Sequence, residues 1–309
     1  VPTGDEGDDE EDEEEEPEPL PFFVAYEVVR NVDANNSLRS DIYGAWFVHG
    51  GGRVSAETRL DNTSLAGDSP GQRIVTAGTA ADVHVLWIDR GGDNAGTNPA
   101  GSDGEPAAGS YGDLASVMIS APSIVTDVED ESFGELVEVV VPDPTFLNDE
   151  ATTTAQHIVA TVSRTNQVFA AWSERDDQAQ TIGPDTLRKD ISLRVADVSG
   201  GSAAGGFLVD DAPLDSLIYA TALAVREDGT IAVSWVENFG GLLRDGFLRR
   251  FSAPGTPLEN PIEIAWDREL NLAFLPDGRL SIAARTGGDI ARLRTEAPEE
   301  EDEEAASEG

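Results

Sequence analysis

Apolar runs recur in pairs along the chain, and the second run of each pair opens on an aspartate. The first runs end at Trp, or at Tyr or Ala in its place, and they span residues 22–26, 83–87, 168–172, 231–235 and 280–284. The second runs begin at Asp41, Asp113, Asp190, Asp245 and Asp289. Side chains alternate within them, as expected of strands in sheets that pack on both faces. A two-strand unit repeated with loops of variable length predicts an all-β fold, a β-propeller or a related array.

Turn signals and further apolar runs extend each pair to four strands, which we call A to D. Turns between strands A and B are predicted at residues 80–82, 165–166, 228–229 and 276–278, where Gly, Asn and Asp favour tight reversals. D strands are expected to start at Gly52, Glu135, Gly206 and Asn260. Five blades of four-stranded antiparallel sheet are therefore predicted. Six blades remain an alternative prediction, because the first repeat lacks a clear inner strand and the last repeat lacks a clear outer strand.

The two ends of the chain differ from the rest in composition. Of sixty acidic side chains, twelve lie in residues 1–19 and eight in residues 296–309. Segments of this kind cannot bury apolar surface, and their charges repel one another. Residues 1–20 and 296–309 are therefore predicted to be disordered acidic tails around a propeller domain of residues 21–295. We expect them to act as solvated spacers rather than as binding tails.

The net charge of −40 makes nucleic-acid binding an unfavourable hypothesis, because neutralising phosphates requires clustered Lys and Arg. The chain has no cysteine, which excludes disulfides and thiolate metal sites, and no apolar run long enough to span a bilayer. It begins at Val1, as expected where a leader has been removed. We expect a secreted, periplasmic or cell-surface protein, with the N-terminal acidic segment as a membrane tether. A halophilic source would explain the same acidity.

Two parts of the chain carry the clearest repeat motifs. In FAAWSERDDQ, followed by KDISLRVADVSGG from Lys189, a Trp precedes charged residues and Asp-Ile opens the next strand. In NLAFLPDGRLSIAARTGGDIARL, from Asn271, a Pro-Asp-Gly hairpin occupies the A–B turn. Both parts resemble repeats of secreted bacterial sialidase-like and TolB-like β-propellers. The resemblance covers residues 21–295 and implies the architecture. The sialidase Asp-box, Ser-x-Asp-x-Gly-x-x-Trp, and the Arg-Ile-Pro motif are not matched, since SDIYGAW (40–46) carries similar letters at another spacing.

Polar residues at or just before the starts of inner strands are the candidates for a ligand site at the mouth of the central channel. They are Arg73, His157, Tyr219, Arg268 and Glu269. A polyhydroxylated or carboxylated ligand would use groups of this kind. The alternative is that they are solvated rim residues, which are polar by default.

A second candidate is a calcium loop at DANNSLRSD. Alternate oxygen-bearing side chains converge on a hard cation in such loops, and here they would be Asp33, Asn35, Ser37 and Asp41. Leu38 stands where the glycine of these loops falls, and an ordinary turn explains the same letters. Calcium is the only cofactor that the sequence suggests. The regular aspartates at the starts of the C strands are expected to cap backbone N–H groups rather than to react.

No catalytic motif is present, so no catalytic residue is predicted. Long B–C loops such as Ile88–Gly112 would lie on one face of a rigid scaffold, where binding residues usually occur. The sequence therefore predicts a non-enzymatic propeller that binds a protein or glycan partner through these loops. The alternative is a glycoside hydrolase, which would need two carboxylates facing each other at the channel mouth.

Overall fold

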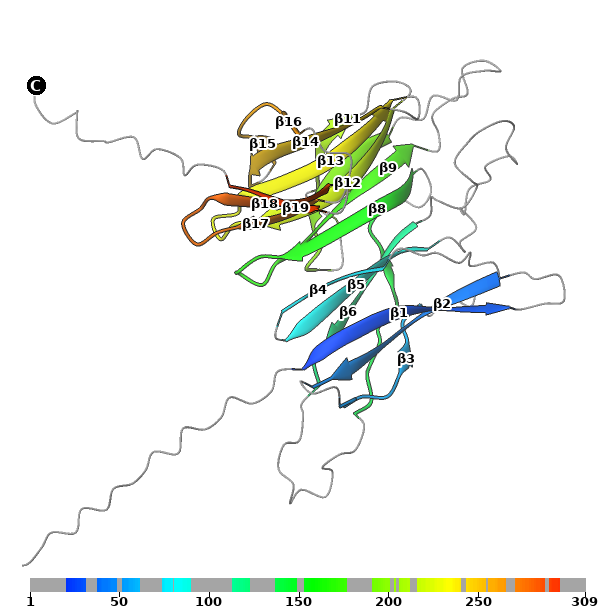
Figure 1. Cartoon of the computed structure of the whole chain (residues 1–309). Coiled ribbons are helices and arrows are strands. Elements are labelled where there is room, and N and C mark those ends of the chain that lie inside the picture. The colour runs from blue at the N-terminus through cyan, green and yellow to red at the C-terminus, as the bar shows by residue number, and fades with distance from the viewer. Residues whose placement is uncertain are drawn as a thin grey trace, which may run out of the picture.

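Figure 1 shows the computed structural model of the chain. It describes residues 21–31, 38–48, 52–61, 74–79, 81–89, 113–122, 137–148, 153–176, 191–200, 203, 206–211, 216–239, 243–253, 255–264, 270–286 and 289–294. These residues form strands and turns and no helix. Since they contain no helix, none could cross a membrane as a helical span.

Five antiparallel sheets contain the strands of the described residues. Sheet 1 consists of β1 (Phe22–Asn31), β2 (Leu38–Phe47) and β3 (Thr58–Arg59). Sheet 2 consists of β4 (Ile74–Gly78), β5 (Asp82–Asp89), β6 (Asp113–Ser120) and β7 (Thr145–Phe146). Sheet 3 consists of β8 (Thr153–Val162), β9 (Val168–Asp176), β10 (Ile191–Asp197) and β11 (Phe207–Asp211). Sheet 4 consists of β12 (Ser216–Val225), β13 (Ile231–Phe239), β14 (Leu243–Ser252), β15 (Thr256–Pro257) and β16 (Ile262–Ile264). Sheet 5 consists of β17 (Leu270–Phe274), β18 (Leu280–Thr286) and β19 (Asp289–Arg294).

The sheets follow one another in chain order, and their inner strands meet. β1 lies against β4, β4 against β8, β8 against β12, and β12 against β17. Figure 1 shows sheet 1 at the bottom and sheets 4 and 5 at the top, with β4 and β8 between them. Successive four-stranded meanders stacked face to face around their inner strands define a β-propeller. The predicted fold class and the five repeats are therefore confirmed.

The core consists of layers between neighbouring sheets, and tryptophans of the second strands fill three of them. Trp87 packs between sheets 1 and 2, Trp172 between sheets 2 and 3, and Trp235 between sheets 3 and 4. Each is at most 2% exposed. Between sheets 4 and 5, where the repeat has Ala284 instead of Trp, Leu280 and Ile282 provide the contact. The repeated Trp is thus a packing residue, as its spacing predicts.

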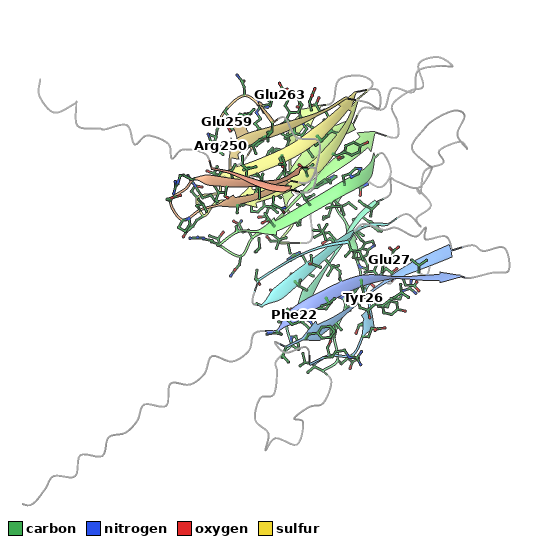
Figure 2. All side chains as sticks on the ribbon, viewed as in Figure 1. Phe22, Tyr26, Glu27, Arg250, Glu259 and Glu263 are labelled. Carbon is green, nitrogen blue, oxygen red and sulfur yellow. The ribbon has the colours of Figure 1, made fainter. Side chains whose placement is uncertain are left out.

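Among the described residues, sheet 1 has no strand inside β1. In Figure 1, β1 runs in the direction opposite to the inner strand β8, so it has the direction of a second strand. Figure 2 shows Phe22, Tyr26 and Glu27 along this strand, and Phe22 is 46% exposed. Within the described residues, β1 is therefore the innermost strand of sheet 1.

The D strand predicted from Glu135 is wrong. The fourth strand of sheet 2 is β7, which lies further along the chain. Val137 instead pairs in parallel with Ser55, beyond the outer edge of sheet 1. The apolar run at 137–141 therefore joins two blades, because alternation in sequence does not specify which edge a short strand will pair with.

Truncating one of the interface tryptophans should destabilise the whole fold. We expect Trp172→Ala to lower the free energy of unfolding by about 3 to 5 kcal/mol, the usual cost of removing a large buried aromatic side chain. Chemical denaturation measures this, with Phe22→Ala as a control at an exposed aromatic. Equal effects of the two substitutions would contradict the packing role of Trp172.

Candidate functional site

Two of the five predicted channel-mouth residues lie in direct contact. His157 is the fifth residue of β8 and Tyr219 the fourth of β12, on the inner strands of neighbouring sheets. Their ring centroids are 4.3 Å apart, with the ring planes at 78°. Both side chains are half-buried. We call these two residues the His–Tyr pair.

Irregular backbone positions the His–Tyr pair. The register between β8 and β9 shifts between Gln156 and Val159, which places His157 within a β-bulge. The register between β12 and β13 shifts between Ala220 and Ala222, directly after Tyr219. A bulge rotates side chains out of the regular alternation. The two bulges therefore explain how residues of separate sheets can bring their rings together.

His157 also has a strained backbone, with φ at +53°. A left-handed conformation costs a non-glycine residue about 1 to 2 kcal/mol. Positions that keep such strain cluster at ligand sites, where the surrounding structure enforces them. Asn166 is the other described non-glycine residue with positive φ, at +61°, and it lies in the turn between β8 and β9, where Asn is usual. The strain at His157 has no such turn to explain it.

The other predicted site residues are not brought together. Arg73, Arg268 and Glu269 lie outside the described residues, as do Asp33, Asn35 and Ser37 of the predicted calcium loop. Whether they join the His–Tyr pair or bind calcium stays a prediction. In the described parts of the chain, no three His, Asp or Glu side chains are arranged so that they could hold a metal ion.

Asp41, the fourth predicted calcium ligand, lies in an ion-paired group of sheet 1. Its carboxylate is 2.9 Å from Arg59 Nη2, and Arg59 Nε is 2.7 Å from Asp61 Oδ1. Both aspartates are buried. Burial raises the pKa of Asp61, although Arg59 lowers it. Arg59 thus neutralises two carboxylates inside the blade, which gives Asp41 a structural role.

A group of carboxylates that the sequence did not predict lies between sheets 3 and 4. Glu237 on β13 is 6% exposed, and its Oε1 accepts a hydrogen bond of 3.1 Å from Trp235 Nε1. Burial raises the pKa of Glu237, and the hydrogen bond from Trp235 lowers it. A hydrogen bond with Asp210 and the negative charges of Asp210 and Asp245 raise this pKa further. We call Glu237, Asp210 and Asp245 the acidic group.

The spacing between Trp and acidic residues in the sequence indicates part of the acidic group, although the alternation of apolar residues does not. An acidic residue follows the repeated Trp by two positions in three repeats, as Asp89, Glu174 and Glu237. Residues two apart share one face of a strand, so Glu174 and Glu237 face the same neighbouring sheet as their Trp. In sheet 3, Glu174 instead pairs with Arg194 Nε at 2.7 Å. The acidic group lies on second, third and outer strands, and Glu237 pairs in register with Ile218 of the inner strand β12, the residue before Tyr219.

No protein-family model matches the sequence, and no curated protein matches it either. Solved structures of similar fold include an ulvan lyase (8% identity, TM-score 0.47), covering 90% of this chain and 64% of that one. A Hadza microbial sialidase has 10% identity and a TM-score of 0.45, and the match covers 84% of this chain and 52% of the sialidase. An endo-arabinase from Bacteroides thetaiotaomicron has 11% identity and a TM-score of 0.41, and the match covers 90% of this chain and 93% of the arabinase. The chain thus spans under two thirds of the lyase and about half of the sialidase. With TM-scores below 0.5, none of these likenesses indicates what this chain binds or does.

Replacing Glu237 by its neutral isostere should stabilise the protein at neutral pH. A carboxyl group with a raised pKa in the folded state favours folding at low pH, and that contribution is lost as the pH rises through the folded pKa. Gln would keep an acceptor for Trp235 and gain a donor towards Asp210. We expect Glu237→Gln to exceed the wild type in free energy of unfolding at pH 7 and to converge with it towards pH 4.

The matched control is Glu259→Gln, which removes the same charge from a carboxylate that pairs with Arg250 at 2.6 Å. Figure 2 shows Glu259 and Arg250 near the outer edge of sheet 4. That variant should gain nothing at pH 7. An equal gain in both variants would mean that net charge alone, and not burial of Glu237, produces the effect.

Proposed function

We propose that this protein is a non-enzymatic β-propeller that binds a glycan on the face where the B–C loops emerge, with the His–Tyr pair as its anchor. The observation that carries this proposal is the strained backbone of His157, which turns its ring against Tyr219 on the next inner strand. Both residues lie in the first half of their strands, towards the face from which the inner strands start. The long B–C loops open on the same face by topology.

The chemistry of the His–Tyr pair suits a sugar. A half-buried phenol and imidazole offer hydrogen-bonding groups for hydroxyls and ring surface for the apolar face of a pyranose. Two rings held edge to face on rigid strands lose little conformational entropy when a ligand binds. A protein partner would be expected to use a larger surface with several aromatic anchors. A secreted or cell-surface location agrees with a glycan ligand and is part of the proposal.

A glycoside hydrolase is the second candidate, and the acidic group is the observation that favours it. A carboxyl group with a raised pKa beside a second carboxylate is the arrangement that acid-assisted hydrolysis uses. The acidic group, however, lies between two sheets, and Glu237 is almost wholly covered. Little of the Glu237 side chain is therefore accessible to a substrate, which favours binding without turnover as the function.

The test is a pair of glycine substitutions with the same backbone effect. His157→Gly removes the imidazole and relieves the positive φ, so the free energy of unfolding should change by less than about 1 kcal/mol. Binding to an immobilised panel of neutral plant, algal and animal glycans, which lack the carboxylate proposed below for the other face, should be lost. Asn166→Gly relieves the same φ in a turn away from the site, and it should keep binding intact. Tyr219→Ala should behave like His157→Gly.

Glycan binding that survives both His157→Gly and Tyr219→Ala would contradict the proposed anchor. Release of reducing ends from any glycan of the panel, abolished by Glu237→Gln, would identify the protein as a hydrolase instead. If a protein partner binds through the same two residues and no glycan binds, the ligand is a protein and not a glycan.

A further inference from the structure

The face opposite the B–C loops has a cavity of about 460 Å³. It lies where the A–B turns of sheets 3, 4 and 5 converge, at residues 163–167, 226–230 and 275–279. Figure 1 shows the β8–β9 and β17–β18 turns at the same end of the molecule. We call it the turn cavity. Its position at the far ends of the inner strands makes it separate from the His–Tyr pair.

Backbone hydrogen bonds hold the three turns in one shape. Asn166 N donates to Ser163 O at 3.1 Å, Gly229 N to Arg226 O at 3.0 Å, and Gly278 N to Leu275 O at 2.9 Å. The fourth residue of each turn has a positive φ, which Asn and Gly adopt readily. The walls of the turn cavity are therefore formed before a ligand arrives, which lowers the entropic cost of binding.

One guanidinium of the turn cavity is fixed by its own turn. Arg226 forms an ion pair with Asp228, which holds the pKa of that carboxyl well below its usual range. A Cβ built on Gly278 would lie 3.0 Å from Arg226 Nη1. Glycine at that position thus lets the guanidinium of sheet 4 lie against the turn of sheet 5.

The second guanidinium has no carboxylate partner within the described residues. Arg164 lines the turn cavity from the turn of sheet 3, and its side chain is exposed. Glu227 and Asp228 line the same cavity, but neither forms a salt bridge with Arg164 among the described residues. An anionic group of a ligand would complete its interactions, preferably as a bidentate carboxylate.

The rest of the lining supplies apolar surface and hydrogen-bond acceptors. Phe274 and Pro276 lie on one side, and Glu227 and Asp228 provide carboxylate oxygens. Carboxylates accept hydrogen bonds from hydroxyl groups, and apolar side chains suit the C–H face of a sugar ring. The cavity volume falls within the range of small-molecule sites.

We infer that the turn cavity is a binding site for a carboxylated sugar, a hexuronate at the end of or within an oligosaccharide. Its carboxylate pairs with Arg164, its ring packs on Phe274, and its hydroxyls donate to Glu227 and Asp228. This site goes beyond the function proposed for the opposite face and does not depend on it.

Isothermal titration with trigalacturonate tests the site, in 0.15 M salt so that distant acidic charges are screened beyond about 8 Å. One site per chain is expected. Arg164→Gln should weaken affinity about tenfold or more, as loss of a charge-assisted hydrogen bond does, and Phe274→Ala should weaken it as well. Arg53→Gln, which removes an exposed guanidinium from sheet 1, is the matched control and should keep wild-type affinity.

Two further ligands and one variant separate the alternatives. Neutral trigalactose should bind at least about tenfold more weakly than trigalacturonate, for the same reason. A tetraglutamate peptide should not compete, and equal binding of that peptide would overturn the sugar assignment. Tyr219→Ala should leave the titration unchanged, whatever it does to glycan binding at the opposite face. No binding of trigalacturonate at millimolar concentration, or equal affinities of Arg164→Gln and Arg53→Gln, would overturn the inference.

Discussion

Burial of the second strands on both faces is the constraint on which the rest of this structure depends. Trp172 contacts the preceding sheet through one face of β9, while Ala171 of the same strand packs towards the following sheet. Both faces of β9 are therefore committed to packing, as interiors of native density require. Both proposed sites lie instead on inner strands and turns.

Charge is arranged around the same constraint. Carboxylates that enter the blades have a neutralising partner, as Asp41 and Asp61 have in Arg59, or Glu174 in Arg194. Glu237 is the contrast, because its described neighbours include two further acids. Burying a carboxyl group without a cation favours its protonated form. The acidic group therefore destabilises the contact between sheets 3 and 4 at neutral pH.

The sequence predicted what local chemistry determines. The turns at Asp228-Gly229 and Pro276-Asp277-Gly278 form where Gly can adopt positive φ, and the Trp residues occupy the predicted layers. What failed depends on partners distant in sequence. The run after Glu135 was assigned to the wrong edge, since a strand of few residues pairs with whichever edge the neighbouring blade offers.

The sequence identified His157 and Tyr219 as candidate ligand-binding residues, but it could not predict that their rings would be in contact. That contact requires two β-bulges and a left-handed backbone at His157. Neither the bulges nor the positive φ can be predicted from the amino-acid composition of these strands. The acidic group was missed because its members come from three strands of two sheets. The spacing of Trp235 and Glu237 was visible, whereas the approach of Asp210 was not.

The measurement that most directly tests whether the inner strands carry the binding function is hydrogen–deuterium exchange of the free and glycan-saturated protein. Binding at the His–Tyr pair predicts slower exchange in β8 and β12, centred on residues 155–159 and 218–222, with β11 and β16 unchanged. Slower exchange confined to the outer strands, with β8 and β12 unaffected, would contradict it.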